Sequence, residues 1–147
     1  MLNPREKNIK MKTIFITGAT SGIGKATAET FAKQGHRLII CGRRKEVLEQ
    51  LQIELSNITE VYSLVFDVRN QEEVENAIHS LPEEWKNIDV LVNNAGNAHG
   101  LESISEGNIA DWDAMMDGNV KGLLYVSQPI IKIMKARNTG HIINISS

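Results

Sequence analysis

Short apolar segments alternate with longer amphipathic ones along most of the chain. The apolar segments are rich in Ile, Val and Leu with little polar alternation, which predicts strands that are covered on both faces. The expected strands are residues 13–17, 37–41, 61–66, 88–93 and 141–145. Apolar residues at helical spacing predict helices over residues 23–35, 44–56, 70–79, 111–117 and 119–136.

This alternation predicts an α/β fold, because strands and helices follow one another through short links. Such links favour right-handed crossovers and hence a parallel sheet. We expect a Rossmann-type doubly wound parallel sheet in three α/β/α layers, with the first five strands present. Polar residues 1–12 are predicted to form an N-terminal extension, and residues 13–147 a single domain.

Individual residues give signals for helix ends and irregularities. Gly35 is expected just past the end of the first helix, and Asn70 is expected at the N-cap of the third. Pro129 falls inside the last expected helix and should kink it or open it locally. That helix has a wide apolar face, wider than contact with one sheet requires. The face comprises Val120, Leu123, Leu124, Ser127, Ile130, Ile131, Ile133 and Met134.

Composition excludes several classes of function. With 41% hydrophobic and 23% charged residues over 147 positions, the chain has the make-up of an ordinary globular protein. The net charge of -2 offers no general attraction to nucleic acid or to anionic membranes. No apolar run approaches the length of a membrane span, and the first residues lack the apolar stretch of a signal peptide. Nucleic-acid and membrane roles are therefore not expected.

The cysteine and histidine content also limits the chemistry. The single cysteine, Cys41, lies in an apolar segment and is expected to be buried. One cysteine cannot form an internal disulfide, which favours a reducing, cytoplasmic setting. The four histidines are His36, His79, His99 and His141. They show no metal-ligand clustering, so no metal site is expected.

A glycine-rich loop joins the first expected strand to the first expected helix. Its sequence is Thr17-Gly18-Ala19-Thr20-Ser21-Gly22-Ile23-Gly24. Glycine permits a tight turn, close approach of a pyrophosphate to the main chain, and close packing of helix on strand. The following helix directs free N–H groups and the positive end of its dipole toward the phosphates. A plain turn also uses glycine, but the preceding strand and the following helix favour nucleotide binding by residues 18–24.

Two arginines follow the second expected strand. A site for NAD would normally place an acidic residue here to bind the ribose 2′-hydroxyl, and Arg43 and Arg44 stand there instead. Their guanidinium groups suit a 2′-phosphate. As plain surface charges at a helix N-terminus they would each be disfavoured by about 0.3–1 kcal/mol. The segment therefore favours NADP(H), with Arg43 the stronger candidate.

Two further segments lie at strand ends, where open α/β sheets bind ligands. Asp67-Val68 ends the third expected strand, and Asn93-Asn94-Ala95-Gly96 ends the fourth. Either segment alone could be a cap or a turn. Together with the Gly-x-x-x-Gly-x-Gly spacing of the loop, they resemble the short-chain dehydrogenase/reductase family.

This resemblance implies roles for individual residues. It places Asp67 and the backbone after it, at Val68, against the adenine of the cofactor. It places a second group along the cofactor ribose: Asn94, Ala95 and Gly96. Asn119 matches the family's catalytic Asn, whose main chain holds a water in a proton relay. Asn119 could also be a polar residue that begins the last helix. In the family this helix packs against a second subunit, which implies a homo-oligomer, a dimer or a tetramer.

The last residues of the chain resemble the family's fifth strand and its catalytic serine. The pattern implies Ser147 for that role, with Ser146 as the alternative, and its hydroxyl would stabilise charge on the substrate oxygen. The family's general acid/base is a Tyr-x-x-x-Lys pair. Neither of the two tyrosines of this chain precedes a lysine at that spacing. We therefore expect the chain to be the N-terminal part of a longer enzyme, inactive by itself.

Several segments resemble one bacterial subgroup of the family, the NADP-dependent 3-hydroxy acid dehydrogenases that also oxidise serine. These segments are residues 42–44, 81–85, 87–89, 111–112 and 140–145. The resemblance implies NADP-linked interconversion of a hydroxyl and a carbonyl on a small 3-hydroxy acid. Two alternatives remain: a ketone reductase of the same family for a sugar, steroid or acyl-carrier substrate, and a non-catalytic nucleotide-binding module.

Overall fold

The computed structural model describes residues 10–100 and 102–146. The strands are β1 (Thr13–Ile16), β2 (Arg37–Gly42), β3 (Val61–Val65), β4 (Val90–Asn93) and β5 (His141–Asn144). The α-helices are α1 (Gly22–Lys33), α2 (Lys45–Ser56), α3 (Gln71–His79), α4 (Ile109–Met116) and α5 (Gly122–Ala136). A 3-10 turn, η2 (Glu83–Trp85), and a π-helical turn, η3 (Asp117–Lys121), complete the described elements. All the expected strands are present, although β4 begins at Val90 rather than at residue 88.

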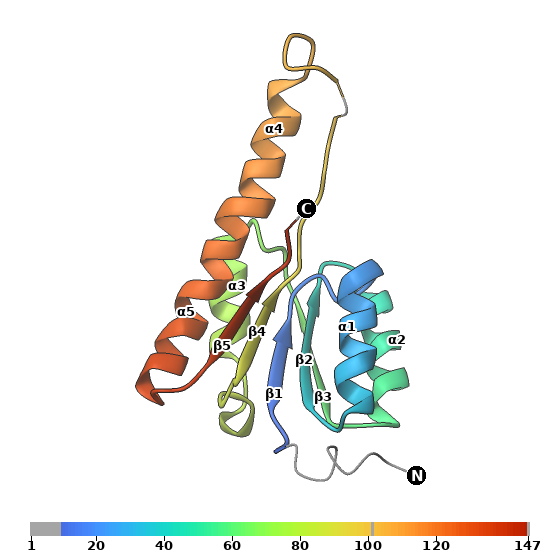
Figure 1. Cartoon of the computed structure of the whole chain (residues 1–147), viewed down its shortest axis with the longest axis vertical. Helices are drawn as coiled ribbons and strands as arrows, with labels where there is room; N and C mark the ends of the chain where they lie inside the picture. The colour runs from blue at the N-terminus through green and yellow to red at the C-terminus, as the bar shows by residue number, and fades with distance from the viewer. Residues whose placement is uncertain (1–9, 101, 147) are drawn as a thin grey trace.

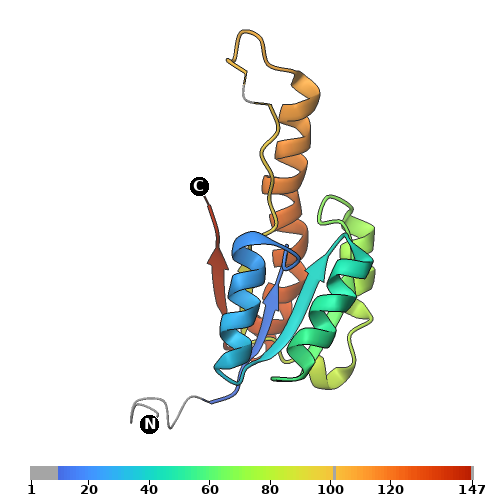
Figure 2. The ribbon, with the colours of Figure 1, turned by 90° about the vertical axis from the view of Figure 1, so that its right-hand side faces the viewer.

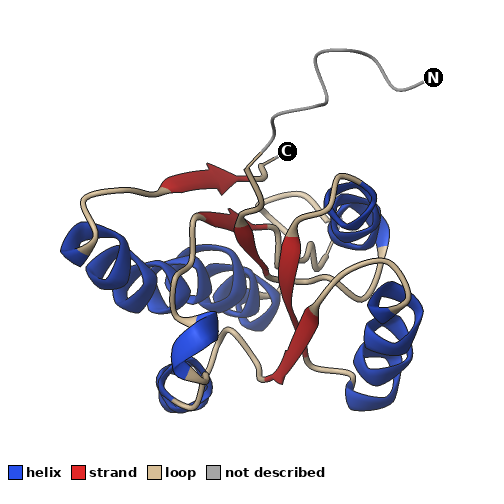
Figure 3. Cartoon of the chain, turned by 90° about the horizontal axis from the view of Figure 1, so that it is seen from below, coloured by secondary structure: helices blue, strands red, loops and turns tan. Residues whose placement is uncertain are grey.

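The described strands form one parallel sheet in the order β3-β2-β1-β4-β5. Helices α1 and α2 cover one face, and α3 and α5 cover the other (Figures 1 and 3). The strand order reverses between β1 and β4, so the chain leaves the sheet on opposite sides at this point (Figure 1). This arrangement confirms the predicted three-layer, doubly wound α/β fold.

The two faces of the sheet carry separate apolar cores, which explains the lack of polar alternation in the strands. Ile14 and Ile16 of β1 pack with α1 and α2, whereas Phe15 between them packs toward α3 and α5. Phe15 and Ile16 are 0% exposed. Successive strand residues point to opposite faces, so a strand covered on both sides needs an apolar residue at every position.

The two last expected helices are a single continuous one, and the predicted break between them is wrong. α4, η3 and α5 follow one another directly from Ile109 to Ala136. Figures 1 and 2 show this helix as a long column whose upper part rises beyond the sheet. Every residue of α4 is described and none is buried. α5 continues through Pro129 as an α-helix, and the geometry of the helix changes upstream, in η3.

The local signals at other helix ends are confirmed. Gly35 adopts φ +79 just past α1 and its N–H donates to Ala32 O at 2.9 Å. This left-handed conformation is one that glycine adopts without steric cost. The side chain of Asn70 accepts a hydrogen bond from Glu73 N and caps α3. Cys41 is buried, as expected.

The start of the described chain is bound to the sheet. Lys12, which the sequence pattern assigned to the N-terminal extension, accepts a hydrogen bond from Arg37 N at 2.9 Å through its carbonyl. Lys12 N donates in turn to His36 Nδ1 at 3.2 Å. Within residues 10–100 and 102–146, no helix is both long enough and apolar enough to cross a bilayer.

Candidate cofactor site

A pocket opens where β1, β2, β3 and β4 end, beside the reversal of strand order. Its volume is about 360 Å³, and both arginines of the β2 end contribute to its wall. The lining residues are Thr17, Gly18, Thr20, Ser21, Ile23, Cys41, Gly42, Arg43, Arg44, Phe66, Asp67, Val68, Arg69, Asn94, Ala95, Gly96, Asn97 and Gly118. Open α/β sheets bind ligands at such a reversal, outside the carboxyl ends of their strands.

The glycine-rich loop forms one wall of the pocket and lies very close to its neighbours. Gly18 adopts φ +62, and a Cβ added to it would lie 2.9 Å from Ala95 Cα. A Cβ on Gly24 would lie 2.2 Å from Gly18 O and 2.4 Å from Asn94 Nδ2. Neither position can hold a larger side chain without displacement of the backbone, so the loop sequence matches its geometry.

Thr17 and Asn94 tie the glycine-rich loop to the end of β4. Thr17 Oγ1 accepts hydrogen bonds from Asn94 N at 3.0 Å and from Ala95 N at 2.9 Å. The Asn94 amide donates to Thr17 O and Gly18 O, each at 3.1 Å. These bonds fix the two loops against each other across the strand reversal, and leave the backbone of Ala95 and Gly96 along the pocket.

The two arginines at the end of β2 occupy different positions. Arg44 is the N-cap residue of α2, and its guanidinium donates to Thr20 Oγ1 at 2.9 Å. Arg43 has 58% of its side chain exposed, and its NH1 atom lies 3.7 Å from Asp67 Oδ2. Arg44 is therefore anchored on the glycine-rich loop, while Arg43 makes one long ion pair and stays accessible at the pocket.

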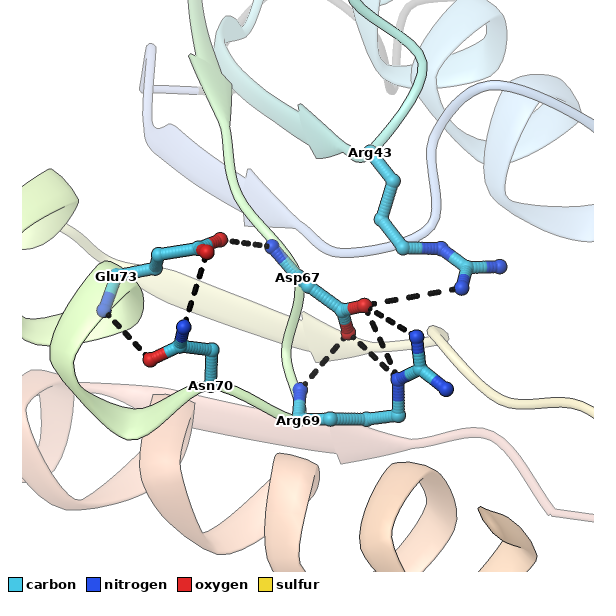
Figure 4. A network of polar contacts seen from close by, with 5 residues as sticks. All are labelled: Arg43, Asp67, Arg69, Asn70 and Glu73. Atoms are coloured by element: carbon cyan, nitrogen blue, oxygen red, sulfur yellow. Dashed lines mark hydrogen bonds and ion pairs between the residues drawn. The ribbon is translucent and has the colours of Figure 1, made fainter.

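Asp67 lies at the centre of a polar network at the end of β3 (Figure 4). Its carboxylate accepts hydrogen bonds from Arg69 Nε at 3.0 Å and from Arg69 NH2 at 2.6 Å. Its main-chain N–H donates to Glu73 Oε2 at 3.0 Å. The side-chain hydrogen bond with Arg69 is the main reason that the pKa of Asp67 is lowered, and the charge of Arg43 adds to it. Asp67 therefore stays ionised at neutral pH.

Asn119 lies in the middle of the long helix, so the alternative that it begins the last helix is wrong. It belongs to the π-helical turn η3. Its Nδ2 donates to Asn97 O at 2.8 Å and its Oδ1 accepts from Asn97 N at 2.9 Å. This reciprocal pair joins the helix to the segment after β4 that lines the pocket. The main-chain relay that the resemblance implies for Asn119 stays a prediction.

The pocket brings most of the predicted cofactor residues together. Three of them do not line it: Ala19 is buried beneath the loop, Gly24 packs against Gly18, and Gly22 is exposed with φ +53. The pocket is also lined by residues that the sequence did not predict for the site: Thr17, Cys41, Gly42, Phe66, Arg69, Asn97 and Gly118. Ser147, the predicted catalytic serine, lies outside the described residues. Within the described ranges, no three His, Cys, Asp or Glu side chains gather in a way that could hold a metal ion.

The residues present fit a dinucleotide with a phosphate on its ribose. The glycine-rich loop at the start of α1 supplies a backbone surface for a pyrophosphate. Arg43 and Arg44 supply charged donors at the end of β2. Asn97 lines the same pocket, and its Oδ1 atom is buried without a hydrogen-bond partner among the described residues. A buried acceptor of this kind is normally satisfied by a ligand or by water.

Comparison with known proteins also indicates a dinucleotide-binding fold. Residues 12–147 match the protein family described as short chain dehydrogenase. The NADP-dependent 3-hydroxy acid dehydrogenase YdfG of Escherichia coli O6:H1 is 46% identical over 134 residues, which are 91% of this chain and 53% of that protein. The serine 3-dehydrogenase of Rhizobium radiobacter is 42% identical over 135 residues, 92% of this chain and 53% of that protein. The chain spans about half the length of these curated relatives.

A solved structure shares both the fold and much of the sequence. The closed form of serine dehydrogenase complexed with NADP+ matches with a TM-score of 0.85 and 45% identity, over 92% of this chain and 54% of that one. The backbone that surrounds the pocket is thus similar to that of a protein that holds NADP+.

Proposed function

We propose that this chain, which belongs to the short chain dehydrogenase family, forms the NADP(H)-binding part of an oxidoreductase that interconverts a hydroxyl and a carbonyl on a small 3-hydroxy acid. The observation that carries the proposal is the pair Arg43 and Arg44 in the wall of the pocket. The names of the relatives support it, because they include an NADP-dependent 3-hydroxy acid dehydrogenase and a serine 3-dehydrogenase.

The choice of NADP(H) over NAD(H) follows from the charges at the end of β2. NAD(H) presents a neutral 2′-hydroxyl, which favours an acidic partner at this place. Arg43 and Arg44 stand there, and both have exposed side chains. The Asp67 carboxylate is already bound by Arg69 at 2.6 Å and is not free to bind a ribose hydroxyl. A 2′-phosphate therefore fits this charge distribution better than a hydroxyl.

Each part of the site has a separate task in this proposal. The glycine-rich loop and the start of α1 bind the pyrophosphate, and Asp67 with the backbone of Val68 lies at the adenine. Asn94, Ala95 and Gly96 line the ribose. When bound, NADP(H) exchanges a hydride with the substrate carbon. Ser147 is proposed to bind the substrate oxygen, and the reciprocal bonds of Asn119 with Asn97 fix the helix beside the site.

We also propose that the protein acts in the cytoplasm as a homo-oligomer, a dimer or a homotetramer. The long helix bears exposed apolar side chains along its upper part, where no described residue of α4 is buried. They are Ile109 at 62%, Met116 at 54%, Val120 at 44% and Leu124 at 57% exposed. A second copy of this helix would remove that apolar surface from water. The free thiol of Cys41 fits a reducing compartment.

Fluorescence titration of the full-length protein with NADPH and NADH tests the cofactor part. The proposal predicts tight NADPH binding, weaker NADH binding, and a selective loss of NADPH affinity in Arg43→Ala. Lys86→Ala, at the opposite end of the sheet, is a matched control that removes one charge. Equal affinity for both cofactors in the wild type would contradict the proposal.

A substrate screen tests the chemistry. Serine, 3-hydroxypropionate and related 3-hydroxy acids are offered with NADP+, beside sugar, steroid and acyl-carrier alcohols. Preferred oxidation of the 3-hydroxy acids supports the proposed substrate class. Preference for one of the other alcohols would reassign the substrate within the same family, and binding of NADPH without turnover of any of them would indicate a nucleotide-binding module.

A further inference from the structure

The proposed phosphate site contains a negative charge of its own. Asp67 lines the same pocket as Arg43 and Arg44, and 23% of its side chain is exposed. Its pKa lies below the usual range, chiefly because of the hydrogen bond with Arg69, so the carboxylate is ionised at neutral pH. A fixed carboxylate beside bound phosphate is a like-charge contact, which is unfavourable. A carboxylate can also compete with the phosphate for the guanidinium groups.

Arg69 engages this carboxylate on two sides. Its Nε lies 3.0 Å from each carboxylate oxygen, and its NH2 lies 2.6 Å from Oδ2. Arg69 N also donates to Asp67 Oδ1 at 3.0 Å. Arg43 NH1 approaches the same Oδ2 atom only to 3.7 Å, which is beyond hydrogen-bond distance. Arg69 therefore occupies the acceptors that Arg43 would otherwise use.

We propose that Arg69 is a positioning residue that determines the preference for NADP(H) over NAD(H): it pairs with Asp67, cancels its charge in the pocket and leaves the guanidinium of Arg43 free for the 2′-phosphate. This inference rests on the proposed function. Figure 4 shows the arrangement, with Arg43 and Arg69 approaching the Asp67 carboxylate from two directions.

The backbone around the pair is held in place by the cap of α3. Glu73 Oε2 accepts from Asp67 N, and Glu73 Oε1 accepts from Asn70 Nδ2 at 2.9 Å. Glu73 N donates to Asn70 Oδ1 at 3.2 Å, which closes a reciprocal cap at the start of the helix. The backbone that carries the carboxylate is thus held at the edge of the pocket, and pairing with a neighbouring cation offsets the charge of the carboxylate there.

Charge counting gives the direction of the effect. Asp67 and Arg69 together are neutral, so Arg43 and Arg44 present two positive charges to a 2′-phosphate of about −1.5 to −2 at pH 7. Without Arg69, the Asp67 charge is uncompensated and Arg43 becomes its nearest partner. Both changes weaken the binding of the 2′-phosphate. The adenine, the pyrophosphate and the nicotinamide are common to NADPH and NADH, so a change in the contact of Asp67 with the adenine alters both affinities alike and leaves their ratio unchanged.

The test measures the dissociation constants of NADPH and NADH by fluorescence titration, in the full-length protein, for Arg69→Gln and for the double variant Asp67→Asn/Arg69→Gln. We expect Arg69→Gln to weaken NADPH binding about tenfold while NADH changes less than about twofold. The double variant removes the carboxylate that Arg69 neutralises. We therefore expect it to restore the NADPH/NADH ratio to within about threefold of the wild type.

Controls separate this role from a structural one. Lys86→Gln removes one positive charge at the other end of the sheet and should leave the ratio unchanged, because charges so far apart are screened. Arg69→Lys retains the charge without the planar fork and should give an intermediate ratio. Thermal unfolding of each variant checks that it is folded. If Arg69→Gln does not fold, Arg69→Lys still tests the proposal.

The outcomes are distinguishable. A wild type without preference for NADPH contradicts the proposed function itself. A wild type that prefers NADPH, with an unchanged ratio in Arg69→Gln, overturns the inference alone. Equal weakening of both cofactors would assign Arg69 a structural role, and a double variant as unselective as Arg69→Gln would mean that Arg69 contacts the phosphate directly. Either result overturns the positioning role.

Discussion

Gly24→Ala is the substitution for which the close packing of the glycine-rich loop makes the sharpest prediction. Gly24 is buried within α1, where alanine has the higher helix propensity. Propensity alone would therefore make Gly24→Ala stabilising by about 1 kcal/mol. The added Cβ would, however, lie 2.2 Å from Gly18 O and 2.4 Å from Asn94 Nδ2. The two considerations have opposite signs, so the measured change decides between them.

The magnitude follows from the contacts that must give way. To reach ordinary van der Waals separation, the loop and the helix must part by about 1 Å, and overpacking of this kind costs about 1–3 kcal/mol. The displacement also disturbs the bonds of Asn94 with Thr17 O and Gly18 O, both 3.1 Å. Each such bond contributes about 1 kcal/mol net. After the propensity gain, we expect Gly24→Ala to lower the free energy of unfolding by about 2–4 kcal/mol.

Urea denaturation followed by circular dichroism measures this change. Gly22→Asn is the matched control, because Gly22 has φ +53 and a Cβ there meets no described atom within 4 Å. Asparagine tolerates that conformation, so the control should cost less than about 1 kcal/mol. NADPH titration of Gly24→Ala should show strongly weakened binding. A Gly24→Ala protein as stable as the wild type would refute the close approach of helix and loop.

Three further predictions concern other parts of the molecule. Burial, assisted by the charge of Lys12, lowers the pKa of His36 from its ordinary value of 6.5. The His36 imidazole therefore binds a proton less readily in the folded protein than in the unfolded chain. The stability that neutral His36 provides should therefore be complete above about pH 6.5 and decline as the pH falls toward the folded-state pKa of His36. Urea midpoints measured against pH should show this decline in the wild type and not in His36→Gln. Asn119→Ala removes both hydrogen bonds to Asn97. The main-chain N–H of Asn97 should then exchange with solvent about five- to tenfold faster, while the N–H groups of β1 keep their exchange rates. An unchanged exchange rate at Asn97 would contradict the pairing. Burial raises the pKa of the Cys41 thiol, so a disulfide reagent should modify it no faster than the protein unfolds, and rapid labelling of the native protein would refute its burial.

The centre of the sheet was predictable because β1, β2 and β4 each contain a run of at least three consecutive apolar residues. Ile14, Phe15 and Ile16 are all buried, on alternating faces, and such a run is read directly from the sequence. The long helix was not predictable as one element. Gly118 and Asn119 resemble a helix break locally, since glycine disfavours a helix. The helix continues there as a π-helical turn, and the side chain of Asn119 bonds the backbone of Asn97, 22 residues earlier in the chain.

The candidate site was predictable where its residues stand at strand ends. The glycine-rich loop, Arg43 and Asp67 each follow a strand directly, and the parallel sheet brings those ends to one edge. The sequence did not predict Arg69 as a site residue, because its pairing with Asp67, two residues earlier, depends on the conformation of the arginine side chain. The sequence predicts Asn93 only as the last residue of the fourth strand, where the Asn-Asn-Ala-Gly segment begins. In the structure its Nδ2 donates to Ser127 Oγ and Asn144 Oδ1, each at 2.9 Å, contacts that a local pattern does not contain.

The central claim is that the pocket at the end of β2 recognises a ribose 2′-phosphate. Isothermal titration calorimetry with 2′,5′-ADP against 5′-AMP tests it most directly, because the two ligands differ only by that phosphate. We predict that 2′,5′-ADP binds at least about tenfold more tightly, that the difference shrinks with rising salt, and that Arg43→Ala removes most of it. Equal affinity for the two ligands in the wild-type protein would contradict the claim.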